Sequence, residues 1–202
     1  MEKNNRNLIT INAVFVVSLI MANVVASKIV DVFGFVVPAA VVAYGITFLC
    51  TDIIGEIWGK EEANKTVKLG FVMQILSLCL IILAIMLPPA VFAVEEGKSF
   101  NSILGQSGRM VVASLIAYLV AQFNDVYVFH KLKAACNGKA KWIRNNGSTI
   151  LSQFFDTAIF ITVAFYGVVP DLGWMVISQY VVKVVIALCD TPFFYFFTRK
   201  DK

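Results

Sequence analysis

The sequence predicts an all-α integral membrane protein with six transmembrane helices and both termini in the cytoplasm. Two features of composition favour this class. Of the 202 residues, 59% are hydrophobic and only 15% are charged, whereas about a quarter of the residues in a soluble domain are charged. The apolar residues also occur in long runs, and ~20 such residues suffice for one helical span. We therefore expect a single transmembrane domain over residues 1–202, with no room for a soluble domain of normal size.

The apolar runs define the expected spans in chain order. The predicted spans cover approximately residues 8–27, 35–58, 67–94, 110–130, 148–168 and 173–197. The first span resembles a signal peptide, because Lys3 and Arg6 precede its apolar core, but Asn12 interrupts that core and we retain it as a span. The stretch "EEGKSFNSILGQSG", residues 95–108, is the longest expected outer loop. The short turn "VVPDLG" makes the fifth and sixth spans antiparallel neighbours.

The distribution of basic residues gives the expected orientation. With the N-terminus inside, 13 of the 17 Lys and Arg residues fall in cytoplasmic segments, and only three fall in outer segments. Cytoplasmic loops carry an excess of these residues in membrane proteins. The asymmetry therefore places both termini in the cytoplasm, and it explains the net charge of +4 without a nucleic-acid partner. Short matches, "TD" in the second span and "DT" in the fifth, suggest an inverted three-plus-three repeat.

Polar and ionisable residues inside the spans are the candidate ligand-binding residues. Such residues are costly in a bilayer and usually face a cavity or a partner. The fourth and fifth spans each carry a Gln and an Asp at i and i+3, which lie on the same helix face. The candidates in and near the spans are Asp52, Glu56, Gln122, Asp125, Gln153, Asp156, Gln179, Lys183 and Asp190.

Structural roles remain open for some of these residues. Asp190 could satisfy a kink made by Pro192, and Asp52 and Glu56 could pair with Lys60 at the membrane surface. For a ligand site, a carboxylate accepts two adjacent N–H groups, and a glutamine both donates and accepts. This chemistry favours a flat, nitrogen-rich ligand. The aromatic residues that could stack on it, or simply pack within the spans, are Tyr118, Phe123, Phe154, Phe155 and Tyr180.

Three segments resemble the queuosine precursor transporters of the vitamin-uptake-transporter family: "FLCTDIIGEIWGKEEA", "AYLVAQFNDVYVFHKLK" and "KWIRNNGSTILSQFFDTAIFITVAFYG". The resemblance covers nearly the whole chain. It implies import of 7-cyano-7-deazaguanine or 7-aminomethyl-7-deazaguanine for salvage of queuosine in tRNA. On this hypothesis Asp156 reads the guanine edge, Gln153 orients it, and Gln122 with Asp125 completes the site. The residues expected to form or gate the cytoplasmic mouth are Arg144, Asn145 and Asn146.

The expected mode of action is a stand-alone carrier in a bacterial cytoplasmic membrane. The stretch "WGKEEANKT" lacks the glycine spacing of a phosphate-binding loop, so nucleotide would not drive this chain directly. The alternatives are a substrate-binding membrane subunit of a multi-component vitamin or nucleobase uptake system, a structural protein, or an intramembrane enzyme with an Asp dyad. We assign no catalytic residue, metal or cofactor. The expected partners are the 7-deazaguanine substrate, the lipid bilayer and a second copy of the chain in a homodimer.

Overall fold

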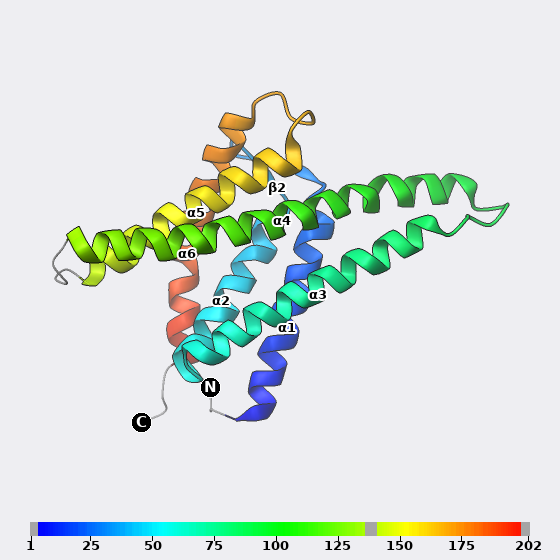
Figure 1. Cartoon of the computed structure of the whole chain (residues 1–202). Coiled ribbons are helices and arrows are strands. Elements are labelled where there is room, and N and C mark those ends of the chain that lie inside the picture. Colours follow the sequence, from blue (N-terminus) through cyan, green and yellow to red (C-terminus); the bar gives the residue numbers. More distant parts are fainter. Residues whose placement is uncertain (1–3, 136–140, 199–202) are drawn as a thin grey trace.

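The chain is mostly helical in its computed structural model, which describes residues 4–135 and 141–198 (Figure 1). Within these ranges, the side chains of residues 60, 121–135, 141–152 and 187–198 are outside the description. The elements are α1 Asn5–Val25, β1 Ile29–Val32, β2 Phe35–Pro38, α2 Val41–Ile57, α3 Lys60–Met86, α4 Val94–Ala135, α5 Lys141–Phe165 and α6 Leu172–Thr198. The helical class is confirmed, with the addition of one antiparallel hairpin in the described part of the chain.

The long helix α4 runs across the whole molecule in Figure 1. It has 42 residues and so extends about 63 Å at ~1.5 Å per residue. Helices α3 and α4 form one hairpin, and α4 and α5 form a second hairpin at the opposite end of α4. Helices α1, α2 and α6 cross this arrangement, and α2 packs against both α1 and α6. Helix α1 begins and α6 ends on the same side of the molecule.

The start of α4 corrects the predicted outer loop. Residues 95–108 are helical, and the connection between α3 and α4 is instead the shorter segment 87–93, which contains two prolines. Glu95 and Glu96 lie in the first turn, where acidic side chains interact favourably with the helix dipole. Gly97, which looked like a loop residue, permits close packing because a Cβ there would lie 2.8 Å from the Pro89 side chain. At this position glycine therefore reflects close packing rather than a loop.

The β-hairpin corrects the predicted start of the second span. Residues 35–38 form β2 and pair with β1, so that α2 begins only at Val41. The turn residues Phe33 and Gly34 have positive φ angles of 54° and 85°, as in the two-residue turns that match the twist of a hairpin. The Asp31 carboxylate accepts a hydrogen bond from the Gly34 N–H at 2.8 Å. Each strand has only four residues, which is too short for a clear period-2 alternation, so the sequence pattern did not predict the hairpin.

Helix α6 holds the hairpin in place. The Trp174 ring stacks on Phe35 with 6.2 Å between ring centroids, and its indole N–H donates to the Gly34 carbonyl at 3.2 Å. The β-hairpin lies on the side of the molecule where α1 ends, and we call this side the hairpin side.

The core consists of two apolar clusters. The larger one joins α1, α4, α5 and α6, and its small side chains let the helices approach closely; its buried alanines are Ala22, Ala26, Ala40, Ala113, Ala117 and Ala164. The smaller cluster lies mainly between α1 and α2 and contains Ile11, Phe15, Cys50, Ile53 and Ile54. The two clusters leave space between them for the cavity described below.

Three described segments are long and apolar enough to cross a membrane: Asn5–Val25, Glu61–Met86 and Val94–Val120. Much of α3 has its apolar side chains exposed, with only 11% of its most apolar stretch buried inside the protein. Such a surface suits lipid rather than water. The count of six spans, the cytoplasmic termini and the inverted repeat stay predictions.

Candidate functional site

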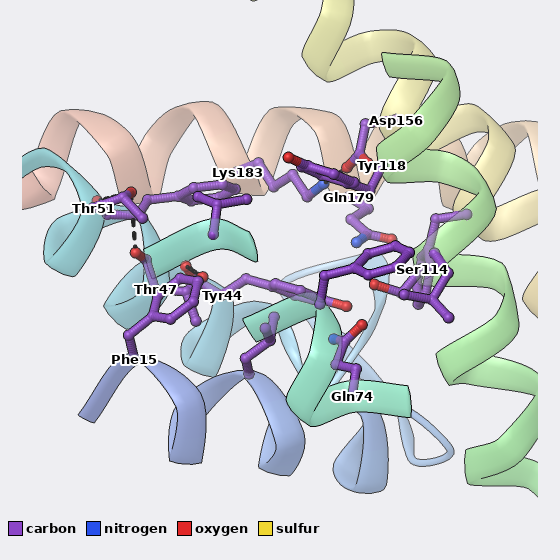
Figure 2. Close-up of a pocket in the computed structure, with 16 residues that line it drawn as sticks. Phe15, Tyr44, Thr47, Thr51, Gln74, Ser114, Tyr118, Asp156, Gln179 and Lys183 are labelled. Atoms are coloured by element: carbon purple, nitrogen blue, oxygen red, sulfur yellow. Dashed lines mark hydrogen bonds and ion pairs between the residues drawn. The ribbon is translucent and has the colours of Figure 1, made fainter. Parts of the chain in front are cut away.

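All six helices contribute side chains to one central cavity of about 190 Å³ (Figure 2). Its lining residues are Phe15, Leu19, Tyr44, Thr47, Phe48, Thr51, Val67, Phe71, Gln74, Ser114, Leu115, Tyr118, Asp156, Phe160, Gln179 and Lys183. Most of this wall is apolar or aromatic, and a few polar groups point inward. That combination is typical of small-molecule sites.

An ion pair forms one side of the cavity. The Lys183 ammonium on α6 lies 3.0 Å from the Asp156 carboxylate on α5 and donates to the Thr157 hydroxyl at 3.1 Å. Lys183 is 8% exposed and Asp156 28%. Burying either charge alone would be costly, whereas pairing with good geometry offsets much of that cost. The apolar run of α5 can therefore contain an aspartate because α6 supplies its counter-charge.

Two buried glutamines have amide atoms without a partner in the part of the chain that the structure describes. Gln179 is 0% exposed, and neither its amide nitrogen nor its oxygen makes a hydrogen bond within the described part of the chain. The amide nitrogen of Gln74 on α3 is also buried and without a described partner. Leaving a buried polar group unsatisfied costs ~1–3 kcal/mol. Because both side chains line the cavity (Figure 2), a bound ligand or water can supply the missing partners.

Helix periodicity places these groups together. Gln179 and Lys183 are at i and i+4 on α6 and so project from one face. Aromatic rings form the flat parts of the wall. Tyr44 contacts Phe160 edge to face with centroids 6.3 Å apart, and the ammonium of Lys183 lies 5.8 Å from the centroid of Tyr44. Ser114 is a hydrogen-bonding partner of Tyr44. The cavity thus combines a charged pair, amide atoms without a described partner, and flat apolar surfaces.

The structure brings together three of the predicted site residues: Asp156, Gln179 and Lys183 all line the cavity. Gln153 does not line it and contributes its backbone carbonyl, which accepts from Thr157 at 2.8 Å. Asp52 and Glu56 are exposed on α2 and are not part of the cavity wall. The side chains that lie outside the described residues are those of Gln122, Asp125, Arg144, Asn145, Asn146 and Asp190.

The aromatic expectations divide in the same way. Tyr118 lines the cavity, where it contacts Phe71 at 6.2 Å between centroids. Phe154 packs edge to face with Phe155 and Tyr180, away from the cavity wall; Phe123 lies outside the described side chains. Sequence reasoning overlooked Tyr44, Gln74 and Ser114. Gln74 carried a signal, since it is an amide within the apolar run of the third span.

Comparisons with known proteins identify the family. Residues 38–197 match a family model described as "Putative vitamin uptake transporter". The chain is 35% identical over 180 residues to a "Probable queuosine precursor transporter" of Bacillus subtilis, covering 87% of this chain and 78% of that protein. It is 26% identical over 176 residues to the "Queuosine precursor transporter" of Escherichia coli, covering 79% of this chain and 71% of that protein. No solved structure matches the chain.

The family match covers most of the chain. It includes the cavity-lining segments of the five helices α2 to α6, and it does not include α1. The long apolar helices agree with the transporter names of the relatives. Together these findings describe a multi-pass membrane protein. The chain belongs to the vitamin uptake transporter family.

Proposed function

We propose that this protein imports queuosine precursors, the bases 7-cyano-7-deazaguanine and 7-aminomethyl-7-deazaguanine, across the bacterial cytoplasmic membrane. Relatives named as queuosine precursor transporters support the general activity. The observation that carries the site assignment is the fully buried Gln179 amide, without a described partner, in the same cavity as the Asp156–Lys183 pair.

The cavity chemistry suits a deazaguanine base. The ring presents an N–H and an exocyclic amine side by side, which a carboxylate such as Asp156 can accept in bidentate fashion. The ring carbonyl can accept from Lys183, and the Gln179 amide can both donate and accept. Tyr44 and Phe160 provide flat surfaces on which a planar ring packs. Size favours a free base, because the cavity of about 190 Å³ is smaller than the ~300–1,000 Å³ of pockets for drug-sized ligands.

The charges of Asp156 and Lys183 would stay compensated both without and with the ligand. Without ligand, the Asp156 carboxylate is neutralised by Lys183 at 3.0 Å. When a base engages the carboxylate, its N–H donors replace part of that interaction, and the ammonium can turn to the ring carbonyl. Neither charge is then left buried and unpaired, which matters because removing one partner of a buried pair is strongly destabilising. For the aminomethyl base, the ligand's own cation can share the carboxylate.

The remaining candidate binding residues are also part of this proposal. Gln122, Asp125 and Asp190 would add polar contacts from α4 and α6, and Gln153 would orient Asp156 through α5. Asp52 and Glu56, exposed at the far end of α2 from the hairpin, would act at the inner mouth. Arg144, Asn145 and Asn146 would line that mouth from the start of α5.

The proposed mode of transport is a stand-alone carrier with six spans and both termini in the cytoplasm, in which one site is reached alternately from the two sides of the membrane. A substrate-binding subunit of a multi-component system is the other reading of the same cavity. Uptake by the purified chain in liposomes separates them, because an obligatory energising partner would leave the chain inactive alone.

The decisive experiment uses cells that cannot make the precursor. Cells expressing the chain are supplied with each 7-deazaguanine at nanomolar concentration, and queuosine in tRNA is measured. We expect restoration by the parent protein and by Glu95→Gln, a change at an exposed carboxylate at the start of α4. We expect loss with Asp156→Asn at equal protein abundance. No restoration by the folded parent would refute the proposed substrate, and normal restoration by Asp156→Asn would refute the site.

A further inference from the structure

A second polar cluster adjoins the cavity, in the narrow contact between α1, α3 and α4. We call it the polar seam and define it by Asn23, Gln74, Ser77 and Ser107. The gap between these residues is too narrow for a water molecule. Asn23 is 1% exposed, and Gln74 and Ser107 are equally well buried. Gln74 lines both the seam and the cavity, so the seam is the layer directly beyond one wall of the cavity.

The seam contains a donor and an acceptor that do not meet. Asn23 donates to the Leu19 carbonyl at 3.1 Å, but its side-chain oxygen has no partner among the described residues. The amide nitrogen of Gln74 is likewise without a described partner. If this helix contact were permanent, apolar side chains here would make the folded protein more stable, because unsatisfied buried polar atoms cost free energy. Both atoms would instead gain water if the helices separated.

The same two helices meet at a second polar contact on the other side of the cavity. There the Thr66 hydroxyl of α3 donates to the Asn12 side-chain oxygen of α1 at 2.6 Å, so this contact is satisfied. Thr66 and Gln74 are about 12 Å apart along α3 at ~1.5 Å per residue. The cavity residues that lie between the two contacts in sequence are Phe15, Leu19, Val67 and Phe71. One end of the α1–α3 interface is therefore closed by a hydrogen bond, whereas at the hairpin-side end the Asn23 oxygen and the Gln74 amide nitrogen have no partner among the described residues.

We propose that the polar seam is the closed gate between the cavity and the hairpin side. It opens when α1 moves away from α3 and α4, and hydration of Asn23 and Gln74 offsets part of the lost packing. This inference rests on the proposed transport function and extends it by assigning the route. With α1 starting in the cytoplasm, the gate faces the outside and admits substrate to the cavity.

The test measures access to the cavity rather than transport. The four native cysteines are replaced by serine, and Ser114→Cys places one thiol in the cavity wall. Intact cells are treated with a membrane-impermeant maleimide, and the labelling rate is recorded. Asn23→Leu removes the hydration gain, so labelling should slow about fivefold, which corresponds to ~1 kcal/mol. Asn23 does not line the cavity, and its replacement leaves the wall intact.

Ser178→Ala is the matched control. Its hydroxyl is also buried and without a described partner, but it lines neither the cavity nor the seam. This change should leave labelling at the parental rate. Equal slowing in both variants, or parental labelling in Asn23→Leu, would overturn the gate.

A reversible cross-link provides a second test that does not require the Asn23→Leu variant to fold. Asn23→Cys and Ser107→Cys, placed in a background without the native cysteines and joined by a short reducible bifunctional reagent, should hold α1 against α4. A subsequent label at Ser114→Cys should be blocked until the link is reduced, and unchanged labelling of the linked protein would overturn the gate. The readout needs no substrate, so gated access without queuosine restoration would reject only the proposed substrate. Restoration with ungated access would reject only the gate.

Discussion

The buried ion pair predicts strongly non-additive effects on stability. Asp156→Asn leaves the Lys183 ammonium, which is 8% exposed, without a carboxylate partner, and Lys183→Met leaves the carboxylate alone. Breaking a fully buried pair costs ~3–5 kcal/mol. Because Asp156 is 28% exposed and water can reach it through the cavity, we expect about 2 kcal/mol for each single change. The double variant removes both charges and should cost no more than either single change, giving a coupling of about 2 kcal/mol.

The assay is denaturant unfolding of the four proteins in the same detergent, with the free energy of unfolding compared in a double-mutant cycle. The control pair is Lys65 and Glu62, which lie 2.6 Å apart on the exposed part of α3. Solvent-exposed pairs of this kind contribute little, so their cycle should show a much smaller coupling. Additive effects of Asp156→Asn and Lys183→Met would refute the reasoning, because the charges would then not stabilise one another in the folded protein.

Two further predictions concern the cavity and the helix contacts. Gln179→Leu removes an amide without a described partner, so we expect unfolding stability to stay equal or rise while queuosine restoration falls more than about tenfold, the effect of losing ~1.4 kcal/mol of binding; normal restoration would exclude an amide–ligand contact. Gly70→Ala would place a Cβ 2.6 Å and 2.8 Å from two side chains of α1, so thermal unfolding in detergent should show a loss of ~1–3 kcal/mol. Gly55→Ala, where the nearest atom is 3.8 Å away, is the tolerated control, and equal losses at both positions would contradict the packing argument.

The local sequence pattern predicted the helices well where apolar runs were uniform. It failed at two segments whose secondary structure depends on backbone geometry and close packing. At residues 33–34 the chain turns through two positive φ angles, and the four-residue strands on either side are too short to show a clear strand pattern. At residues 95–108 the glycines and serines indicated a loop, but a helix forms because acidic residues begin it and Gly97 packs closely against the preceding turn. In each case the segment contains residue types that occur both in helices and in turns.

The same division holds within the candidate site. Asp156, Gln179 and Lys183 were identifiable because polar residues in apolar spans are costly and need a purpose. Their mutual placement was not identifiable, since Asp156 and Lys183 are far apart in sequence and meet only because α5 and α6 pack side by side. Tyr44 and Ser114 escaped notice because tyrosine and serine in spans are ordinary packing residues until a neighbouring helix turns them toward a cavity.

The sequence by itself determined that this is a membrane protein of long apolar helices and pointed to the family to which the chain belongs. Those conclusions depend on composition and local order, which need no knowledge of contacts. Only the tertiary structure decided which polar residues share a space: the carboxylate of α5 with the ammonium of α6, and the amide of α3 with that of α1. The physical reason is that the free energy of a buried polar group is set by its neighbours, and those neighbours come from other helices.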